Sequence, residues 1–552
     1  MPSRTWRVAI ALIFALTLLL PLYHLSDARQ LSYLTAPQKH DDQPGPADPN
    51  RSDDKNAQNQ LEPGPASPPP GVFNNTLYRG EGSPVQQQFS ALKSPCDGFP
   101  KMDDIMFVLK TGATEAFDKL PTQLLTNLQC LDDFLLFSDL EQQIGKYHIY
   151  NALDRVAESI KKAHPEFDLY QAQIDCPVSQ KECTKSLKGG WDLDKFKFLN
   201  IVARTWEMKP DREWYVFGEA DTYIVWKSLV HFLHDRVKSK DTPYVGSVAM
   251  YGGFPFAHGG SGYVLSGAAM KKMIDDIPNL AAKYDNQTEG ECCGDVMLAR
   301  AAKEVSVKVK QAHPMFNGEK PNTLPFGPGQ WCEPILTMHH VNSEEVSALW
   351  QYEQTRINKD FIQIKDIYEA FFAPRLVQYR TEWDNLSEDT CYIAPDEEAQ
   401  KKADQSSKKK QLEEKKKSFV EKNAHSSAAA CAKVCESEGL IDDDSKAGFK
   451  GLNADEYDKA DTETARSKMI AAAYESKLKK DPGFGKKRKC FQWRYHRNGV
   501  CCTAKTFKHG VPKRGKEKDV PEWTSGWFVR GIKEWTKQQG KCAVEWKEPR
   551  IL

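Results

Sequence analysis

Two carboxylates that follow an aromatic strand are the residues of this chain best placed to do chemistry. Glu219 and Asp221 come after the apolar run Trp214 to Phe217 and the turn residue Gly218. The run predicts a buried β-strand, and open α/β sheets bind ligands at the carboxyl ends of such strands. Carboxylates on one turn can share a hard divalent cation, and that cation can hold the diphosphate of a nucleotide. We therefore predict a metal and nucleotide site at this turn.

The spacing of these two acids does not by itself single out a site. Similar pairs occur at Asp192 and Asp194 and at Asp442 and Asp444, so an ordinary acidic turn is the competing interpretation. The neighbouring residues add the signal, because Trp-Tyr-Val-Phe precedes the pair and Thr-Tyr-Ile-Val follows it at 222–225. With these neighbours the segment resembles the metal-binding signature of glycosyltransferase family 31, which includes core 1 β-1,3-galactosyltransferase and the Fringe enzymes.

Three further blocks follow in the order found in that family. The glycine-rich segment 259–266 is similar to the family block that shapes the acceptor pocket, and it lacks the Gly-Lys-Ser/Thr ending of a phosphate-binding P-loop. Asp295 takes the position of the catalytic base, with Gly294 in place of the usual acidic neighbour; a helix N-cap is its other interpretation. His339 aligns with the histidine that completes the metal site, although a structural histidine is the commoner role.

The resemblance implies a full set of site residues. Its donor-binding residues are Thr111, Asp139, Lys197 and Glu219; its acceptor-binding residues are Gly259, Gly260, Tyr263 and Trp331; its metal ligands are Glu219, Asp221 and His339; and its catalytic base is Asp295. Without the resemblance, Thr111 and Asp139 are polar residues at strand ends, and Lys197 is a solvated surface lysine.

Alternating strand and helix patterns predict an α/β fold. Apolar runs at 105–109 and 133–137 indicate strands, and the pattern over 115–127 indicates a helix. An amphipathic helix is expected at 191–208, before the acidic strand. Such alternation favours a mostly parallel sheet. The resemblance, which covers roughly residues 103–345, implies a GT-A-like, Rossmann-like glycosyltransferase domain.

Composition favours a protein of the secretory pathway. The chain of 552 residues carries 76 basic and 76 acidic residues, so it has no net positive charge that would attract nucleic acid. Its 14 cysteines are an even number, and the adjacent pairs Cys292-Cys293 and Cys501-Cys502 do not match a C-x-x-C zinc pattern, which favours disulfides. Glycosylation acceptor patterns begin at Asn74, Asn286 and Asn385.

The chain divides by composition into six parts. Arg4 and Arg7 precede an apolar run from Val8 to Tyr23, which predicts an uncleaved signal anchor, with a cleaved signal peptide as the alternative. We expect a cytosolic tail at 1–7, a transmembrane signal anchor at 8–25, a disordered luminal stem at 26–95, a GT-A-like catalytic domain at 96–375, a charged linker at 376–430, and a small disulfide-rich region at 431–552. The last part loosely resembles a PAN/apple module, a class that binds protein or carbohydrate.

These features together predict a single-pass type II Golgi membrane enzyme with a luminal catalytic domain. It would be an inverting β-1,3-hexosyltransferase that uses Mn²⁺ and a UDP-sugar, with UDP-galactose as the first-choice donor. The acceptor would be a GalNAc-type or other glycan, or a glycoprotein, and a homodimer is a candidate assembly. One alternative is a Fringe-like N-acetylglucosaminyltransferase. Another is a non-catalytic chaperone or lectin, because Glu219-Ala220-Asp221 departs from the family's Asp-Asp-Asp at two positions.

Overall fold

The computed structural model describes residues 94–552, apart from 242, 441–450, 454–455, 458, 461–462 and 516–520. The expected cytosolic tail, signal anchor, nearly all of the stem and the acceptor pattern at Asn74 therefore lie outside the described residues. Within the described part of the chain, no helix is long and apolar enough to cross a membrane.

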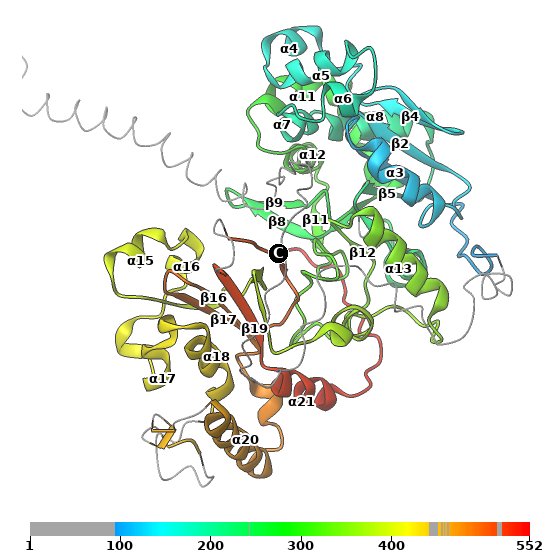
Figure 1. Ribbon diagram of the computed structural model, residues 1–552. Helices are drawn as coiled ribbons and strands as arrows, with labels where there is room; N and C mark the ends of the chain where they lie inside the picture. The colour runs from blue at the N-terminus through cyan, green and yellow to red at the C-terminus, as the bar shows by residue number, and fades with distance from the viewer. Residues whose placement is uncertain are drawn as a thin grey trace, which may run out of the picture. The chain divides into compact units, whose positions relative to one another are not determined.

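An eight-stranded sheet forms the centre of the segment from residue 105 to 311 (Figure 1). Its strands, in spatial order, are β11 (Val309–Gln311), β7 (Tyr244–Gly246), β10 (Tyr263–Ser266), β5 (Trp214–Glu219), β1 (Ile105–Lys110), β2 (Phe134–Ser138), β4 (Tyr147–Asn151) and β3 (Gln142–Ile144). β5, β1, β2 and β4 run parallel to one another, and β7 runs parallel to β11, whereas β10 is antiparallel to both β5 and β7, and β3 is antiparallel to β4. The prediction of a mainly parallel α/β sheet is confirmed.

Helices bury both faces of this sheet. The helices of the region are α3 (Ala116–Leu125), α4 (Glu158–Ala163), α5 (Glu166–Ile174), α6 (Gln180–Cys183), α7 (Gly190–Asp194), α8 (Lys197–Met208), α9 (Trp226–His231), α10 (Gly267–Asp276), α11 (Leu280–Glu289), α12 (Gly294–Glu304) and α13 (Ser343–Thr355). Met106 and Val108 pack with α8, α10 and α12, whereas Ile105 and Phe107 pack with α3 and α9. Successive strand side chains point to opposite faces, so a strand covered on both sides is a continuous apolar run.

The helix expected over 191–208 is two helices. α7 ends at Asp194 and α8 begins at Lys197, and Phe196 between them is buried against the ring of Phe167, 4.9 Å away between ring centroids. The break places Asp194 and Lys197 at a junction rather than on one continuous helix surface.

The parallel register brings three strand ends to one edge of the sheet. Lys110, the last residue of β1, lies opposite Phe137 of β2 and Glu219 of β5. Asp139 follows β2 directly. The polar residues that end these apolar strands therefore meet at the carboxyl edge, where such sheets bind ligands.

A short antiparallel pair carries a distant histidine to the same edge. β6 (Tyr223–Ile224) pairs with β12 (Thr337–Met338), with Met338 opposite Tyr223. The amide of Val341 donates to the carbonyl of Asp221 at 3.0 Å. These bonds place residues 339 and 340 beside the acidic turn, although more than a hundred residues separate the two in sequence.

The C-terminal part forms a second sheet of five antiparallel strands, in the order β13 (Tyr379–Thr381), β19 (Trp523–Trp527), β16 (Gln492–His496), β17 (Val500–Ala504) and β15 (Thr390–Ile393). Segment 376–430, expected to be a charged linker, supplies β13, β15 and several short helices. The charged residues of this segment lie on solvent-facing sides of regular elements. In α15 (Glu397–Lys402), Lys401 and Lys402 pair with the exposed Glu397 and Glu398, whereas the strand β15 is buried.

Every cysteine is in a disulfide, as the even count predicted: Cys96–Cys130, Cys176–Cys183, Cys292–Cys293, Cys332–Cys542, Cys391–Cys502, Cys431–Cys501 and Cys435–Cys490. Two of them fasten α18 (Ala428–Ser437) to the C-terminal sheet, through Cys501 of β17 and through Cys490 just before β16.

The two remaining glycosylation patterns differ in access. Asn286 on α11 is exposed. Asn385 is completely buried, and its amide donates to the carbonyls of Trp493 and Gly526 at 3.0 and 3.2 Å. A glycan on Asn385 would replace one of the two amide hydrogens and has no room on a completely buried side chain, so the folded chain offers only Asn286 of these two as an acceptor.

The disulfide between Cys332 and Cys542 should contribute strongly to stability. It spans a sequence separation of 210 residues, and in the chain-entropy account longer loops gain more from closure. We expect Cys332→Ser with Cys542→Ser to lower the free energy of unfolding by about 2–5 kcal/mol, measured by denaturant titration. The matched control is Cys176→Ser with Cys183→Ser, which opens a separation of only 7 residues and should cost less. An equal loss in both double variants would contradict the loop-length argument.

Candidate metal and donor site

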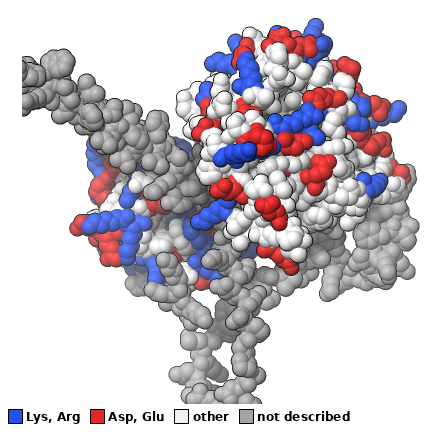
Figure 2. Space-filling view, turned by 90° about the horizontal axis from the view of Figure 1, so that it is seen from above, with Lys and Arg blue, Asp and Glu red and all other residues white. Residues whose placement is uncertain are grey.

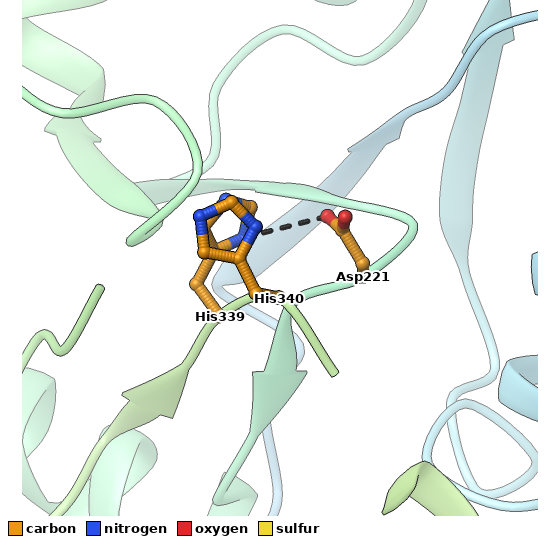
Figure 3. Close-up of side chains that lie close together, drawn as sticks. All are labelled: Asp221, His339 and His340. Carbon is orange, nitrogen blue, oxygen red and sulfur yellow. Dashed lines mark ion pairs between the residues drawn. The ribbon is translucent and has the colours of Figure 1, made fainter. Parts of the chain in front are cut away.

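Three side chains at the acidic turn form a cluster that could hold a metal ion. One ligand atom each from Asp221, His339 and His340 lies within 4.8 Å of the others (Figure 3). His339 Nδ1 is 3.4 Å from Asp221 Oδ1. Burial lowers the pKa of His339 to about 3 and also lowers that of His340, so both rings are neutral at physiological pH and can donate a lone pair. A carboxylate with two imidazoles suits divalent transition metals such as Mn²⁺, Fe²⁺ or Zn²⁺.

The cluster differs from the predicted ligand set in one residue. Asp221 and His339 belong to it, but His340 takes the place expected for Glu219. The Glu219 carboxylate instead faces the ammonium of Lys110 at 3.1 Å. His340 has a positive φ of 60°, which ordinary residues seldom adopt, and this conformation turns its ring toward the cluster. The doublet His339-His340 was the sequence signal for this ligand.

The glycine-rich loop lies across the cluster. It joins β9 (Phe254–Ala257) to β10, and a methyl group on Gly260 would overlap the imidazole of His339. The hydroxyl of Thr222 donates to the carbonyl of Gly260 at 2.8 Å, and that of Thr337 donates to the carbonyl of Ser261 at 2.6 Å. The loop backbone is thus bonded to the strands next to the candidate metal ligands, and glycine is required where the loop meets the ring.

Gly260→Ala should therefore displace His339 and weaken metal binding. We expect at least a tenfold loss of Mn²⁺ affinity, measured by isothermal titration calorimetry. The control is Gly290→Ala, because a methyl group there would meet nothing closer than 3.9 Å and its φ is −79°. Unchanged affinity in Gly260→Ala would mean that the ring does not ligate the ion.

A buried network of alternating charges occupies the neighbouring strand ends. Lys197 is 2% exposed, and its ammonium pairs with Asp139, with Asp194 at 3.1 Å, and with the carbonyl of Thr111 at 3.0 Å. Burial alone would lower the pKa of Lys197, but Asp139 and Asp194 raise it above its usual value. Lys110 likewise pairs with Asp194 and with Glu219. The surface-lysine interpretation of Lys197 is wrong, because α8 points its first residue into the sheet edge.

Asp139 and Thr111 stand at the ends of β2 and β1, as predicted. Asp139 accepts hydrogen bonds from the amide of Ala113 at 2.9 Å and from the Gln173 side chain at 3.1 Å. The buried Thr111 hydroxyl has no partner among the described residues. A buried hydroxyl without a partner costs free energy, which fits a group that awaits a ligand.

Several charged residues of this edge were not predicted. Asp194 belongs to the acidic pair that served as an example of an ordinary turn, and only the break between α7 and α8 brings it here. Lys110 closes an apolar strand, a position that sequence alone does not distinguish from a solvated end. Lys119 of α3 pairs with Asp221 at 3.1 Å, and with His339 it keeps the pKa of that carboxyl below its usual value despite burial.

Asp295 lies on the other side of the same loop. Its carboxylate accepts from the amides of Gly259 and Val296, both at 2.9 Å, and it is 7% exposed. Burial raises its pKa, although both amides and the nearby His258 oppose the rise. The N-cap of α12 is Cys293, so Asp295 is not the capping residue but lies in the first turn of the helix. Two backbone amides, one in the glycine-rich loop and one in the first turn of α12, thus hold the carboxylate in place.

Gly294 has a packing reason to lack a side chain. A methyl group there would overlap the ring of Phe198 and the carbonyl of Lys195. The acidic neighbour expected from the family pattern therefore has no room in this chain.

The predicted acceptor residues divide into two places. Tyr263 stacks on Phe217, with 4.9 Å between ring centroids, and with Gly259, Lys110 and Glu219 it lines a small cavity. Trp331 lies elsewhere: its indole packs against Tyr368 and Trp535, at 5.1 and 5.0 Å, in the core beside the C-terminal sheet. The structure brings Gly259, Gly260 and Tyr263 together with the metal cluster and leaves Trp331 out.

No protein-family model and no curated protein matches this chain. The chemistry of the site therefore follows from its own geometry. Adjacent loop residues connect its parts, because Gly259 bonds Asp295 while Gly260 packs on His339. One edge thus combines a cation-binding cluster, two lysines suited to phosphate, and a buried carboxylate suited to accept a proton.

Proposed function

We propose that this protein is an inverting, UDP-sugar-dependent β-1,3-glycosyltransferase with a GT-A-like fold. One observation carries the proposal: Asp221, His339 and Asp295, which the resemblance to family 31 nominates from distant parts of the chain, surround one glycine-rich loop at the carboxyl edge of a mainly parallel sheet. A mixed ligand cluster alone would fit many hydrolases, but its combination with buried lysines and a separate base fits transfer from a diphosphate donor.

The donor would lie along the ends of β1, β2 and β5. Lys110 and Lys197 would exchange part of their pairing with Asp194 for the phosphates of UDP, and Thr111 and Asp139 would contact the nucleoside. A divalent cation, Mn²⁺ in this proposal, would be held by Asp221, His339 and His340 and would neutralise charge on the departing UDP.

Asp295 would act as the general base. In one displacement, the acceptor oxygen forms a bond to the anomeric carbon while the bond from that carbon to the UDP oxygen breaks, and the acceptor proton passes to the Asp295 carboxylate. The elevated pKa suits this task, because a carboxylate of higher pKa is a stronger base.

The proposed setting is the Golgi lumen, with the chain anchored as a type II membrane protein. The seven disulfides agree with an oxidising compartment. Acidic and basic side chains are interspersed over the described residues of the face in Figure 2. The proposed substrates are UDP-galactose and a GalNAc-type or other glycan acceptor, free or on a glycoprotein.

Release of UDP from a panel of UDP-sugars tests the proposal. The full chain, made in a eukaryotic secretory pathway, is assayed with each donor, with Mn²⁺ or EDTA, and with a panel of glycan acceptors. We expect metal-dependent release of UDP from one donor, UDP-galactose. Release from UDP-N-acetylglucosamine instead would make the enzyme Fringe-like. Absence of release from every donor and acceptor pair would reject the proposed activity in favour of a non-catalytic chaperone or lectin.

A further inference from the structure

A second cavity shares no lining residue with the metal cluster. Its volume is about 320 Å³, within the range of small-ligand sites. Its walls come from residues 95–100, 126–130, 225–228, 350–356 and 359–362. Helix α13 begins three residues after His340, and the lining residues Trp350 and Glu353 lie about 10–15 Å further along it, so the cavity is a separate site.

The walls combine aromatic side chains with a few polar groups. The aromatic side chains are those of Trp226, Trp350 and Phe99. The Trp226 indole donates to the carbonyl of Asn127 at 2.9 Å, which fixes its ring. The amide nitrogen of Asn127, a residue that is only 4% exposed, has no partner among the described residues. A buried donor of this kind costs free energy until a ligand supplies an acceptor.

A carboxylate completes the wall. Glu353 accepts a hydrogen bond from the hydroxyl of Tyr223, and burial raises its pKa to about 7, although the Tyr223 bond and nearby Arg356 and Lys359 lower it. Its other oxygen has no hydrogen bond to a described residue and is free to accept one from a ligand hydroxyl.

The lining holds equal numbers of acidic and basic residues: Asp97, Glu353 and Asp360 against Lys227, Arg356 and Lys359. Because the pKa of Glu353 is about 7, that carboxyl is ionised only in part at neutral pH. The two lysines already donate to backbone carbonyls: Lys359 to those of Glu353 and Gln354 at 3.0 and 2.8 Å, and Lys227 to that of Lys359. Both ammonium groups are thus already bonded, and the Arg356 guanidinium lies 3.9 Å from the carboxylate of Asp366, so a phosphate or carboxylate ligand would have to displace an existing partner.

We propose that this cavity is a second carbohydrate-binding site, which takes a neutral saccharide with its apolar face on Trp350 and its hydroxyls bonded to Glu353 and Asn127. Neutral, polyhydroxylated rings with C–H faces match a cavity that has aromatic side chains, an unpaired amide donor and ammonium groups that are already bonded. Binding follows from the cavity alone. Its use, to hold a more distant unit of the acceptor glycan, rests on the proposed transferase function.

Direct binding tests the site. The full chain, saturated with UDP and Mn²⁺, is titrated with a panel of neutral mono- and oligosaccharides followed by saturation-transfer NMR and calorimetry. We expect one of the panel to bind, and Trp350→Ala and the nearly isosteric Glu353→Gln each to weaken it about tenfold, as loss of one stacking or hydrogen-bonding contact does. Trp191→Ala on α7, where the side chain is 56% exposed, should leave affinity unchanged.

The outcomes separate the two proposals. Saccharide binding that persists in Asp295→Asn supports the second site even if no donor is ever turned over. A panel that does not bind, binding insensitive to both Trp350→Ala and Glu353→Gln, or displacement of the saccharide by a peptide instead, would overturn it. Transferase activity would survive each of those results.

Discussion

Asp295→Asn should reduce sugar transfer by about 10²- to 10⁴-fold, the usual contribution of a general base. The substitution removes the ability to accept a proton while keeping the size of the side chain. Its oxygen can still accept one of the two backbone hydrogen bonds, from Gly259 or Val296, so the loop and the first turn of α12 should keep their places. The measurement is UDP release at saturating donor, with circular dichroism as the check on folding.

Asp285→Asn is the matched control. Asp285 is also a buried aspartate whose pKa is raised by burial, and it accepts one backbone bond, from the amide of Ala157 at 3.1 Å. It lies on α11 and touches none of the site residues, so turnover should be unchanged. Equal losses in both variants would show that the effect of Asp295→Asn is structural and would remove Asp295 from the mechanism.

The pH profile gives an independent check on the same residue. Because burial raises the pKa of Asp295, the active carboxylate is present above that raised value and is lost as the pH falls through it. The acidic limb of kcat/KM should therefore lie at a higher pH than an ordinary aspartate would give. A limb at the ordinary position would contradict the buried environment of this base.

The fold could be predicted as far as local patterns determine it. The apolar runs of β1, β2 and β5 are continuous because both faces of these strands are buried, and that property is visible in sequence. The C-terminal strands were missed because β13 and β15 are short and lie within a charged segment. The strands that pair with β13 and β15 are more than a hundred residues away, and no local periodicity in the segment indicates these pairings.

The site shows the same limit in more detail. Asp221, His339 and Asp295 could be nominated from the sequence because each sits in a recognisable block. Lys110 and Asp194 were not, since their roles arise from the register of β1 with β5 and from the break between α7 and α8. Gly294 illustrates the reverse case: it departs from the family pattern, and the ring of Phe198 explains why.

The candidate metal ligands are the residues for which the sequence prediction and the structure differ most clearly. The sequence nominates Glu219 with Asp221 and His339, whereas the structure gathers Asp221, His339 and His340 and turns Glu219 toward Lys110. Three variants distinguish the two sets: Asp221→Asn, His340→Ala and Glu219→Gln. Affinity for Mn²⁺, measured by calorimetry or by the loss of free-ion signal in electron paramagnetic resonance, reports on ligation without requiring turnover.

Asp221→Asn should weaken Mn²⁺ binding by at least about 100-fold, because loss of a direct ligand should exceed the 10- to 100-fold cost of losing a supporting contact. The charge on Asp221 also offsets Lys119, which lies 3.1 Å away, so the neutral variant would leave that ammonium to repel the ion. His340→Ala should weaken binding as well, whereas Glu219→Gln should change it little. The opposite order for His340 and Glu219 would restore the ligand set that the sequence nominates and would require the carboxylate to leave Lys110 when the ion binds.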